Sequence, residues 1–304
     1  MIPSYRYNDQ KKFLHMKLIR FGKNGEEKPG IVIDGVHYDV SGFCEDYNED
    51  FFGSNGLGRL DDLLKENQGR LPKIDGDVRL GSPIARPSKI VCIGLNYADH
   101  AKETNATIPN EPVVFLKATS SLCGPFDDII IPKNSEKTDW EVELAVVMGK
   151  KASYVDEDNA MNYVAGYCLH NDVSERNFQL ERNGTWDKGK GCDTFAPIGP
   201  WLVTKDEITD LNNLRLWLTV NGKAMQNGTT SNLIFRIPFL VSYVSQFMSL
   251  LPGDVISTGT PAGVGLGMKP NVYLKDGDVV ELGIDGLGQA RQRVKAYHSQ
   301  TIES

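Results

Sequence analysis

The sequence predicts an α+β protein in which strands dominate. Two observations lead to this fold class: strand-like runs outnumber helical ones, and they do not alternate regularly with helices, as a doubly wound parallel sheet would require. The 304 residues are 40% hydrophobic and 24% charged, which suits a globular chain with a sizeable core. We therefore expect a mixed, β-dominated architecture of one large and one small domain.

The amino-terminal part predicts the small, β-rich domain. The runs MKLIRF and GIVIDGVHYDV are strand-like, and Asp34-Gly35 suits a type I′ turn between alternating strands. Residues 56–70 have the apolar spacing of a short helix. The turn-rich and proline-rich stretch DVRLGSPIARPSKI then places a boundary near residue 86, dividing 1–85 from 86–304. Residues 1–15 precede the first strand and are expected to form a loose extension.

The larger domain is expected to contain most of the strands. A hairpin turning at Asn221-Gly222 is predicted in LRLWLTVNGKAMQ. Helices are predicted in SERNFQLER, capped by Ser174, and in IPFLVSYVSQFMSL, which has Pro238 near its first turn and should be largely buried. A shorter helix is predicted in DEDNAMNYVAG, with acidic capping residues, and ADHAKET is expected to be the start of a helix or an ordered turn. The remaining strands are predicted in KIVCIGLNY, IPNEPVVFLK, DDIIIP, YCLHNDV, DVISTG, DVVELGI and RQRVKAY.

Charge and hydropathy exclude two classes of partner. The net charge of −7 and the absence of a broad basic cluster argue against nucleic acid. No segment approaches the roughly 20 apolar residues that a membrane helix needs, and the amino terminus has no apolar stretch of signal-peptide length, so a cytoplasmic protein is expected. The five widely spaced cysteines are expected to be buried thiols in a reducing compartment: Cys44, Cys92, Cys123, Cys168 and Cys192.

The run WEVELAVVM, residues 140–148, contains two glutamates inside a strand-like segment. Successive side chains of a strand point to opposite faces, so Glu141 and Glu143 share one face, and Trp140, Val142 and Leu144 take the other. A half-exposed strand with a wet polar face is the simpler interpretation. The alternative is a pair of oxygen ligands for a divalent cation, which needs a third carboxylate nearby.

Asp172 is the candidate for that third carboxylate. It follows YCLHN at the predicted end of a strand, where chemistry is often presented, although it could instead cap the following helix. Grouped with the two glutamates, it would suit Mg²⁺ or Mn²⁺ with positions left for a substrate. Three converging carboxylates without a cation would cost several kcal/mol. A metal therefore follows if they converge.

His100 and Glu103 are three residues apart, so on a helical turn they lie on one face and can form a hydrogen bond. A carboxylate that orients an imidazole makes it a better general base, although on spacing alone an exposed histidine beside a solvated glutamate is the favoured interpretation. Lys190 lies among glycines that would let the backbone approach a ligand, but alone it is an ordinary loop lysine. The glycine-rich run at 258–267 lacks the pattern of a nucleotide-binding loop.

These segments, in this order, resemble the fumarylacetoacetate hydrolase superfamily. The matching stretches cover most of residues 88–268: GLNYADHAKE, EPVVFLK, DWEVELAVVMGK, GYCLHNDVSERNFQ, KGKGCDTFAPIGP, VNGKAMQNGTTSNLIF and STGTPAGVG. The resemblance implies a mixed β-sandwich roll that houses the site, preceded by a small amino-terminal domain and usually assembled as a homodimer.

The resemblance also implies roles for individual residues. Glu141, Glu143 and Asp172 match the family's metal ligands, for Mg²⁺ or Mn²⁺. His100 and Glu103 match the dyad that activates water, typically on a lid segment, and Lys190 matches the lysine that faces the substrate. Positions around the bound keto acid are matched by Arg176, Gln179 and Thr260.

The implied activity is metal-dependent hydrolysis of a carbon-carbon bond in a 2,4-diketo acid, which releases pyruvate. The stretch from residue 171 to 203 is most similar to a branch that includes hydrolases of 2,4-diketo-3-deoxy sugar acids. The polar residues Glu175, Arg182, Asn183 and Asp187 would suit a polyhydroxylated tail. Alternatives are an acylpyruvate hydrolase or oxaloacetate decarboxylase, a ureidoglycolate lyase, a hydroxyheptadienedioate isomerase, and, in another class, a non-catalytic keto-acid binding protein.

Overall fold

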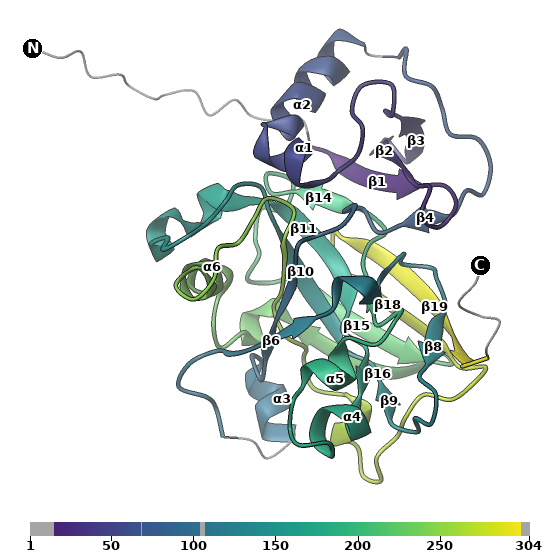
Figure 1. Cartoon of the computed structure of the whole chain (residues 1–304), viewed down its shortest axis with the longest axis vertical. Helices are drawn as coiled ribbons and strands as arrows, with labels where there is room; N and C mark the ends of the chain where they lie inside the picture. Colours follow the sequence, from purple (N-terminus) through teal and green to yellow (C-terminus); the bar gives the residue numbers. More distant parts are fainter. Residues whose placement is uncertain (1–14, 68, 104–106, 299–304) are drawn as a thin grey trace, which may run out of the picture.

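The computed structural model describes residues 15–67, 69–103 and 107–298. The amino-terminal strands are β1 (Lys17–Phe21), β2 (Lys28–Ile33) and β3 (Val36–Asp39), which form an antiparallel meander (Figure 1). Asp34 and Gly35 between β2 and β3 both have positive φ, as a type I′ turn requires. Helices α1 (Glu49–Gly53) and α2 (Gly56–Glu66) cover this meander, and the short β4 (Leu80–Gly81) pairs with β1. The predicted turn and helix are confirmed.

One long sheet runs through the molecule in the order β3-β2-β1-β14-β11-β10-β17-β5-β6. Strand β1 pairs with β14, so the amino-terminal meander continues the sheet of the larger part of the chain. The division into domains at residue 86 stays a prediction. The bounds of the other strands are β14 (Leu202–Thr204), β11 (Val164–Asn171), β10 (Val142–Met148), β17 (Val255–Ser257), β5 (Ile90–Gly94) and β6 (Val113–Lys117).

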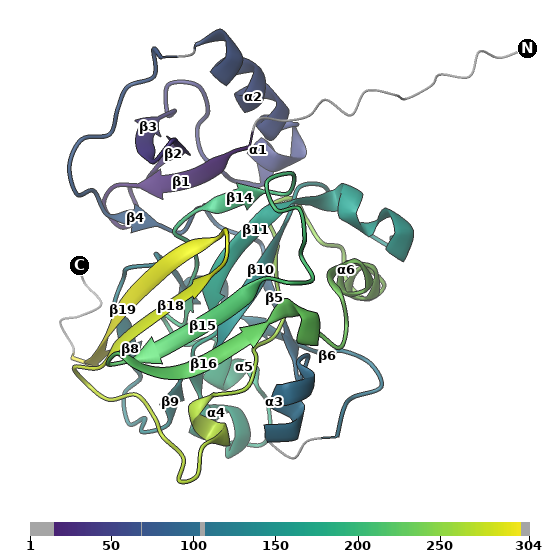
Figure 2. The same cartoon turned by 180° about the vertical axis from the view of Figure 1, so that it is seen from behind.

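A second sheet of five strands packs against the middle of the first, and Figure 2 shows it in front of β10 and β11. Its order is β16 (Lys223–Thr229), β15 (Arg215–Val220), β18 (Val279–Ile284), β19 (Gly288–Ala296) and β8 (Ile129–Ile131). The predicted hairpin at Asn221-Gly222 joins β15 to β16. The two packed sheets, with few helices, confirm the predicted β-dominated α+β class.

Strand β10 is buried on both faces, which corrects the interpretation of a half-exposed strand. Val142 and Leu144 belong to the core between the two sheets. Ala145 and Val147, on the opposite face, belong to a second core that includes Phe51 of α1. The face that carries Glu141 and Glu143 therefore continues into the protein interior, where charged side chains have little contact with bulk water.

Short helices and strands surround the larger sheet. Helices α3 (Ala98–Glu103), α4 (Arg176–Leu180) and α5 (Asp187–Lys190) gather at one end of the molecule in both views (Figures 1 and 2). Helix α6 (Ile237–Ser245) begins with Pro238 in its first turn, as predicted, and buries one face rather than its whole surface. The short strands are β7 (Leu122–Cys123), β9 (Thr138–Asp139), β12 (Ser174–Glu175) and β13 (Ala196–Pro197).

One local prediction is wrong. Ser174 does not cap the helix that follows it, because it lies in β12, paired with Asp139, and its hydroxyl donates to the Asp172 carbonyl. The cap is Glu175, whose carboxylate accepts from the Asn177 amide. The short helix predicted in DEDNAMNYVAG is present as a 3₁₀ helix, Glu157–Tyr163, with the acidic Asp156 as its N-cap, although the Asp156 side chain makes no capping hydrogen bond.

The cysteines are all free; Cys92 and Cys168 are buried, and the other three are half-buried, so the expectation of buried thiols holds only in part. No helix in the described part of the chain is long and apolar enough to cross a membrane.

Candidate active site

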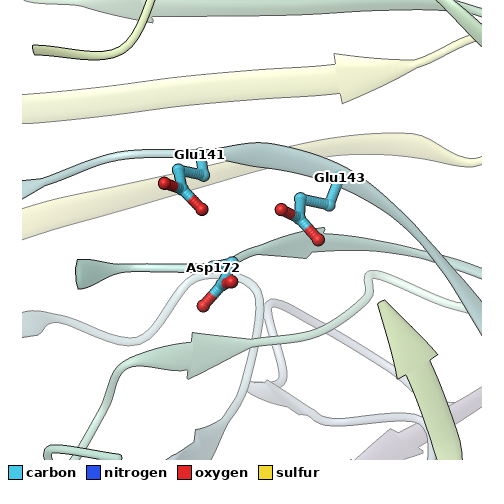
Figure 3. Close-up of side chains that lie close together, drawn as sticks. All are labelled: Glu141, Glu143 and Asp172. Carbon is cyan, nitrogen blue, oxygen red and sulfur yellow. The ribbon is translucent and has the colours of Figure 1, made fainter. Parts of the chain in front are cut away.

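Three carboxylates meet at the start of β10 and the end of β11. The antiparallel register pairs Val142 with Asn171 and Glu143 with His170, so the next position places Glu141 opposite Asp172. One oxygen from each of Glu141, Glu143 and Asp172 lies within 4.8 Å of the others, and all three residues are buried. Figure 3 shows the three carboxylates facing a common space. The structure thus brings together the three residues that the sequence grouped.

Buried cations neutralise two of these carboxylates. The Lys190 ammonium donates to Glu141 at 2.7 Å and to Asp172 at 2.8 Å. Arg176 donates to Glu141 at 2.6 Å, and Lys117 donates to Asp172 at 2.5 Å. Burial alone would raise the pKa of Glu141 and of Asp172, but these cations outweigh it and hold both pKa values below their usual range. Burial likewise opposes the charge of Lys190, yet Asp172 and Glu141 keep its pKa above the ordinary value.

Within the described chain, Glu143 forms hydrogen bonds with neutral groups rather than with a cation. The Ser257 hydroxyl and the Gly259 amide donate to its Oε2 at 2.5 and 3.0 Å. Burial and the neighbouring charges of Asp172 and Glu141 raise the pKa of Glu143 well above its usual value. The donor set therefore fits a divalent cation: hard oxygen ligands converge, and the least compensated of them would gain most from a nearby positive charge.

A neutral histidine is linked to the Glu143 carboxylate through the Ser257 hydroxyl. The Nδ1 atom of His170 lies 2.6 Å from the Ser257 hydroxyl, which itself donates to Glu143. Burial lowers the pKa of His170 to about 3, so its imidazole is uncharged at neutral pH. The Ser257 hydroxyl can accept from one neighbour and donate to the other, which fixes the orientation of the Glu143 side chain.

His100 and Glu103 lie together on α3, with 3.4 Å between Nδ1 and Oε2. The Gly263 amide donates to both oxygens of Glu103, at 3.0 and 3.1 Å. Burial raises the pKa of Glu103, but the hydrogen bonds from His100 and from the Gly263 and Val264 amides outweigh it, so the pKa is lowered. Gly267 also contacts this side chain, because a Cβ atom there would lie only 2.4 Å from Glu103 Cδ.

Arg176 is held by a buried carboxylate of β9. Its Nε atom donates to Asp139 at 2.9 Å, and its Nη1 atom donates to Gln179 at 3.0 Å. Asp139 also accepts from the backbone amides of Gly265 and Leu266, at 2.7 and 2.9 Å. One carboxylate therefore ties the guanidinium to the glycine-rich loop that contacts Glu103.

The glycine-rich run has a structural role in this region. The hydroxyl of Thr260 donates to the Val142 carbonyl at 2.9 Å and lies 2.8 Å from the Gln226 amide nitrogen, which donates to it. Thr260 thus fixes the start of β10 while it faces the interior.

A cavity of about 180 Å³ connects these groups. Seven of the nine residues singled out from the sequence line it: His100, Glu141, Glu143, Arg176, Gln179, Lys190 and Thr260. Of the other two, Asp172 lies beside Glu141 and accepts from Lys190, and Glu103 contacts His100. The arrangement presents a metal-ligand set, a potential general base and an ammonium to one small space.

Four buried polar residues of this region escaped the sequence analysis. Lys117 lies at the end of an apolar run, where a lysine usually reaches solvent, and its position beside Asp172 depends on pairing between distant strands. Asp139 directly precedes the WEVE segment, and this adjacency was the one available signal. His170 and Ser257 lie at or near the ends of largely apolar strands, and only the pairing of these strands shows that they meet.

Residues 89–295 of the chain match the family described as fumarylacetoacetate (FAA) hydrolase, C-terminal. A protein of Burkholderia multivorans named "Putative hydrolase" is 54% identical over 92% of this chain and 99% of its own length.

Several solved structures are similar throughout. A fumarylacetoacetate hydrolase from Exiguobacterium antarcticum is 37% identical with a TM-score of 0.83, covering 93% of this chain and all of the other. A probable 2-hydroxyhepta-2,4-diene-1,7-dioate isomerase from Mycobacterium abscessus is 32% identical with a TM-score of 0.80, covering 94% of this chain and all of the other. A maleylpyruvate hydrolase from Sphingobium, in complex with manganese(II) and pyruvate, is 28% identical with a TM-score of 0.78, covering 93% and 100%.

Proposed function

Because the chain belongs to the fumarylacetoacetate hydrolase family, we propose that it is a metal-dependent hydrolase of 2,4-diketo acids, which it cleaves to pyruvate and a carboxylic acid. One observation carries the proposal: the buried Glu141, Glu143 and Asp172 cluster lies beside the same cavity as the His100 and Glu103 pair. A binding site for a cation explains the cluster, but only catalysis needs an imidazole oriented by a carboxylate.

The metal ligands are Glu141, Glu143 and Asp172, and the ion is Mg²⁺ or Mn²⁺. When bound, it supplies a Lewis acid that polarises the 2-oxo acid and stabilises the charge of its enolate. The solved maleylpyruvate hydrolase that this chain resembles is in complex with manganese(II) and pyruvate. That precedent supports a pyruvate-like half of the substrate at this site.

The net charge of the site also favours a negatively charged substrate. Three cations, Lys117, Arg176 and Lys190, face four buried carboxylates, namely Asp139 and the three proposed ligands. With a divalent ion the cluster carries a net charge of about +1 if all seven side chains are ionised, which the carboxylate of a keto acid would neutralise. Gln179, Thr260 and Arg176 line the cavity around that position and are the proposed substrate-binding residues.

The hydrolytic step assigns a role to each catalytic residue. His100, oriented at Nδ1 by Glu103, takes a proton at Nε2 from the water that attacks the C4 carbonyl. Lys190 uses two of its three donors on Glu141 and Asp172, so within the described chain one donor remains for the C4 oxyanion. Collapse of that oxyanion breaks the C3-C4 bond. The pair of electrons goes to the enolate of pyruvate, which is protonated at C3, and the C4 fragment leaves as a carboxylic acid.

The proposal is tested by measuring pyruvate release, coupled to lactate dehydrogenase, from acetylpyruvate, a 2,4-diketo-3-deoxy sugar acid and oxaloacetate, each with Mg²⁺ and with EDTA. Cleavage of a diketo acid that EDTA abolishes supports the hydrolase. Release of pyruvate from oxaloacetate alone would replace it with a decarboxylase. No turnover, with Mg²⁺ still raising thermal stability, would replace it with the non-catalytic keto-acid binding protein.

An isomerase is the second candidate, favoured by the similarity to the structure named as a probable dienedioate isomerase. Both reactions pass through a stabilised enolate, so the same ligands would serve. A change in the absorbance of a 2-hydroxydienoate without release of pyruvate would indicate isomerisation rather than cleavage. A ureidoglycolate lyase would release glyoxylate rather than pyruvate. Detection of glyoxylate would support this alternative, and its absence would exclude it.

We also propose that the enzyme is a cytoplasmic homodimer. The free state of all five cysteines agrees with a reducing compartment. Light scattering coupled to size-exclusion chromatography tests the dimer, because a mass near 33.7 kDa would instead identify a monomer.

A further inference from the structure

The residues that line the cavity fall into two chemical classes. One class is the set of polar and charged residues described above. The other consists of Ile93 and Gly94 of β5 together with five residues that have large aliphatic or aromatic side chains, which we name the apolar wall: Leu95, Phe115, Leu180, Trp186 and Leu266. A substrate whose 2-oxo acid half binds to the polar residues leaves these apolar side chains as the surface for its C4 substituent.

Trp186 is the centre of the apolar wall, and its position depends on Gly94. A Cβ atom at residue 94 would lie 2.4 Å from Trp186 Cζ3, so the missing side chain makes the space in which the indole lies. Phe115 packs edge-to-face on Trp186, with ring centroids 5.3 Å apart. The Lys190 ammonium lies over the Phe115 ring, 5.0 Å from the ring centroid. The wall therefore begins at the group that would bind the C4 oxyanion.

The polar residues that would suit a hydroxylated tail are engaged elsewhere. The Glu175 carboxylate accepts from Thr138 and from the Lys137 amide. Asp187 accepts from the Leu116 amide at 2.8 Å. Arg182 lies over the Phe178 ring at 4.7 Å. With Asn183, which is exposed, none of these side chains is among those that line the cavity.

Among the described residues that line the cavity, the lysine and arginine side chains are Lys190 and Arg176, and both are hydrogen-bonded to carboxylates of the site. In this part of the chain, no further lysine or arginine lines the cavity to pair with a second carboxylate.

Resting on the proposed function, we propose that the apolar wall selects 2,4-diketo acids with an uncharged, apolar C4 substituent, and that Trp186 is the specificity-determining residue. Hydroxyl groups on the substituent would lose water without gaining a partner, and a carboxylate would be buried without a cation. Because an apolar pocket rejects an added hydroxyl only modestly, the expected preference is about 10- to 100-fold in kcat/KM.

The first test compares the wild type on substrates that share the 2-oxo acid half: a 2,4-diketo acid with a propyl substituent at C4, its hydroxylated counterpart of equal chain length, and its terminal carboxylate counterpart. The alkyl substrate should lead by about 10-fold or more. Equal or better turnover of the hydroxylated or carboxylated compound would overturn the inference and leave the hydrolase intact. No turnover of any of the three would instead refute the proposed function.

The second test uses Trp186→Ala and Trp186→Phe. Trp186→Ala should raise KM for the alkyl substrate about 10- to 100-fold, Trp186→Phe should restore most of the loss, and both should bind oxalate with Mg²⁺ as the wild type does, because oxalate has no C4 substituent. Phe178→Ala is the matched control, since Phe178 lies on neighbouring α4 but not at the cavity. If the substrate ranking of Trp186→Ala equals that of the wild type while oxalate binding is intact, Trp186 does not determine specificity.

Leu180→Ser covers the case in which the tryptophan variants fail to fold. Leu180 is 45% exposed at the mouth of the cavity, so its replacement has little effect on the core. The substitution should lower kcat/KM for the alkyl substrate relative to the hydroxylated one. An unchanged ratio would contradict a role for the wall in selecting the substituent.

Discussion

Glu141 and Asp172 lie opposite each other across strands β10 and β11, and the Asp172 amide donates a hydrogen bond of 2.9 Å to the Glu141 carbonyl. The backbone itself therefore sets the distance between two of the proposed ligands. A site built on paired strands needs little rearrangement to accept an ion, which favours both affinity and selectivity for geometry.

Replacing Glu143 with Gln should abolish stabilisation by metal without weakening the metal-free fold. The amide keeps the acceptor for Ser257 and Gly259 but removes the charge that repels Glu141 and Asp172. Thermal unfolding with EDTA should match the wild type within about 1 kcal/mol, whereas the rise in Tm with Mn²⁺ should disappear. Glu281→Gln, at an exposed carboxylate of β18, is the control and should keep that rise. An unaltered response of Glu143→Gln would exclude Glu143 as a ligand.

His100→Ala should separate chemistry from binding. Loss of the general base is expected to lower kcat by about 10²- to 10⁴-fold. Binding of Mn²⁺ and of oxalate, measured by calorimetry, should stay near the wild-type value, because His100 is not a proposed ligand. If the wild type itself shows no measurable turnover, the protein is better explained as a non-catalytic keto-acid binding protein.

Gly267→Ala should act through Glu103. The added methyl would displace the Glu103 carboxylate, which is a flexible group, so the cost in stability should be small. The dyad would lose its alignment, and kcat should fall by about 10- to 100-fold. In a Glu103→Ala background the same substitution should have no further effect, because its contact is gone. Gly42→Ala, where a Cβ would meet nothing within 4 Å, is the control. Additive effects in the double variant would contradict this contact.

Lys117→Met should destabilise the protein strongly, although Lys117 is not a proposed catalytic residue. It leaves the buried Asp172 with Lys190 as its remaining cation in the described chain, and breaking one partner of a buried pair costs about 3–5 kcal/mol. Lys295→Met breaks the exposed pair with Asp128 and should cost less than about 1 kcal/mol. Urea denaturation of both variants measures the difference, and equal midpoints would show that burial of Lys117 has no energetic consequence.

The contribution of Glu103 to stability should depend on pH. Its pKa is lowered in the fold, so the carboxylate stabilises the folded state fully above the unfolded pKa of about 4.3, and this contribution is lost as pH falls through the folded value. The difference in unfolding free energy between the wild type and Glu103→Gln should therefore be largest near neutral pH and shrink below about pH 4. Denaturation curves at both pH values measure it; a difference that grows on acidification would reverse the sign of the shift.

The sequence predicts some of these relationships because they are local. Alternation along a strand places Glu141 and Glu143 on one face, and a spacing of three on a helix brings His100 to Glu103. Asn221-Gly222 and Asp34-Gly35 specify their turns through positive φ.

Other relationships depend on pairing between distant segments and have no local signal. Lys117 lies at the end of β6, and two strands, β17 and β5, stand between β10 and β6 in the sheet. The contact of Lys117 with Asp172 therefore depends on the order of the strands and not on the local sequence. Serine is a common helix cap, but Ser174 pairs with Asp139 in a strand, so the helix begins one residue later and its cap is Glu175. The apolar wall is likewise assembled from segments that are far apart in the sequence, including strand β6 and helix α4, so its character could not be inferred from the polar residues nearby in the chain.

The pairing of β1 with β14 has a consequence for how the chain folds. The amide of Met16 donates to the Thr204 hydroxyl, 188 residues later. During synthesis, the meander of the first strands must therefore wait with one edge unpaired until most of the chain has emerged, which raises the contact order and slows folding. An open strand edge is also a template for pairing with other chains. Fragments that end before residue 202 are consequently expected to aggregate, even though they contain the whole amino-terminal meander and its helices.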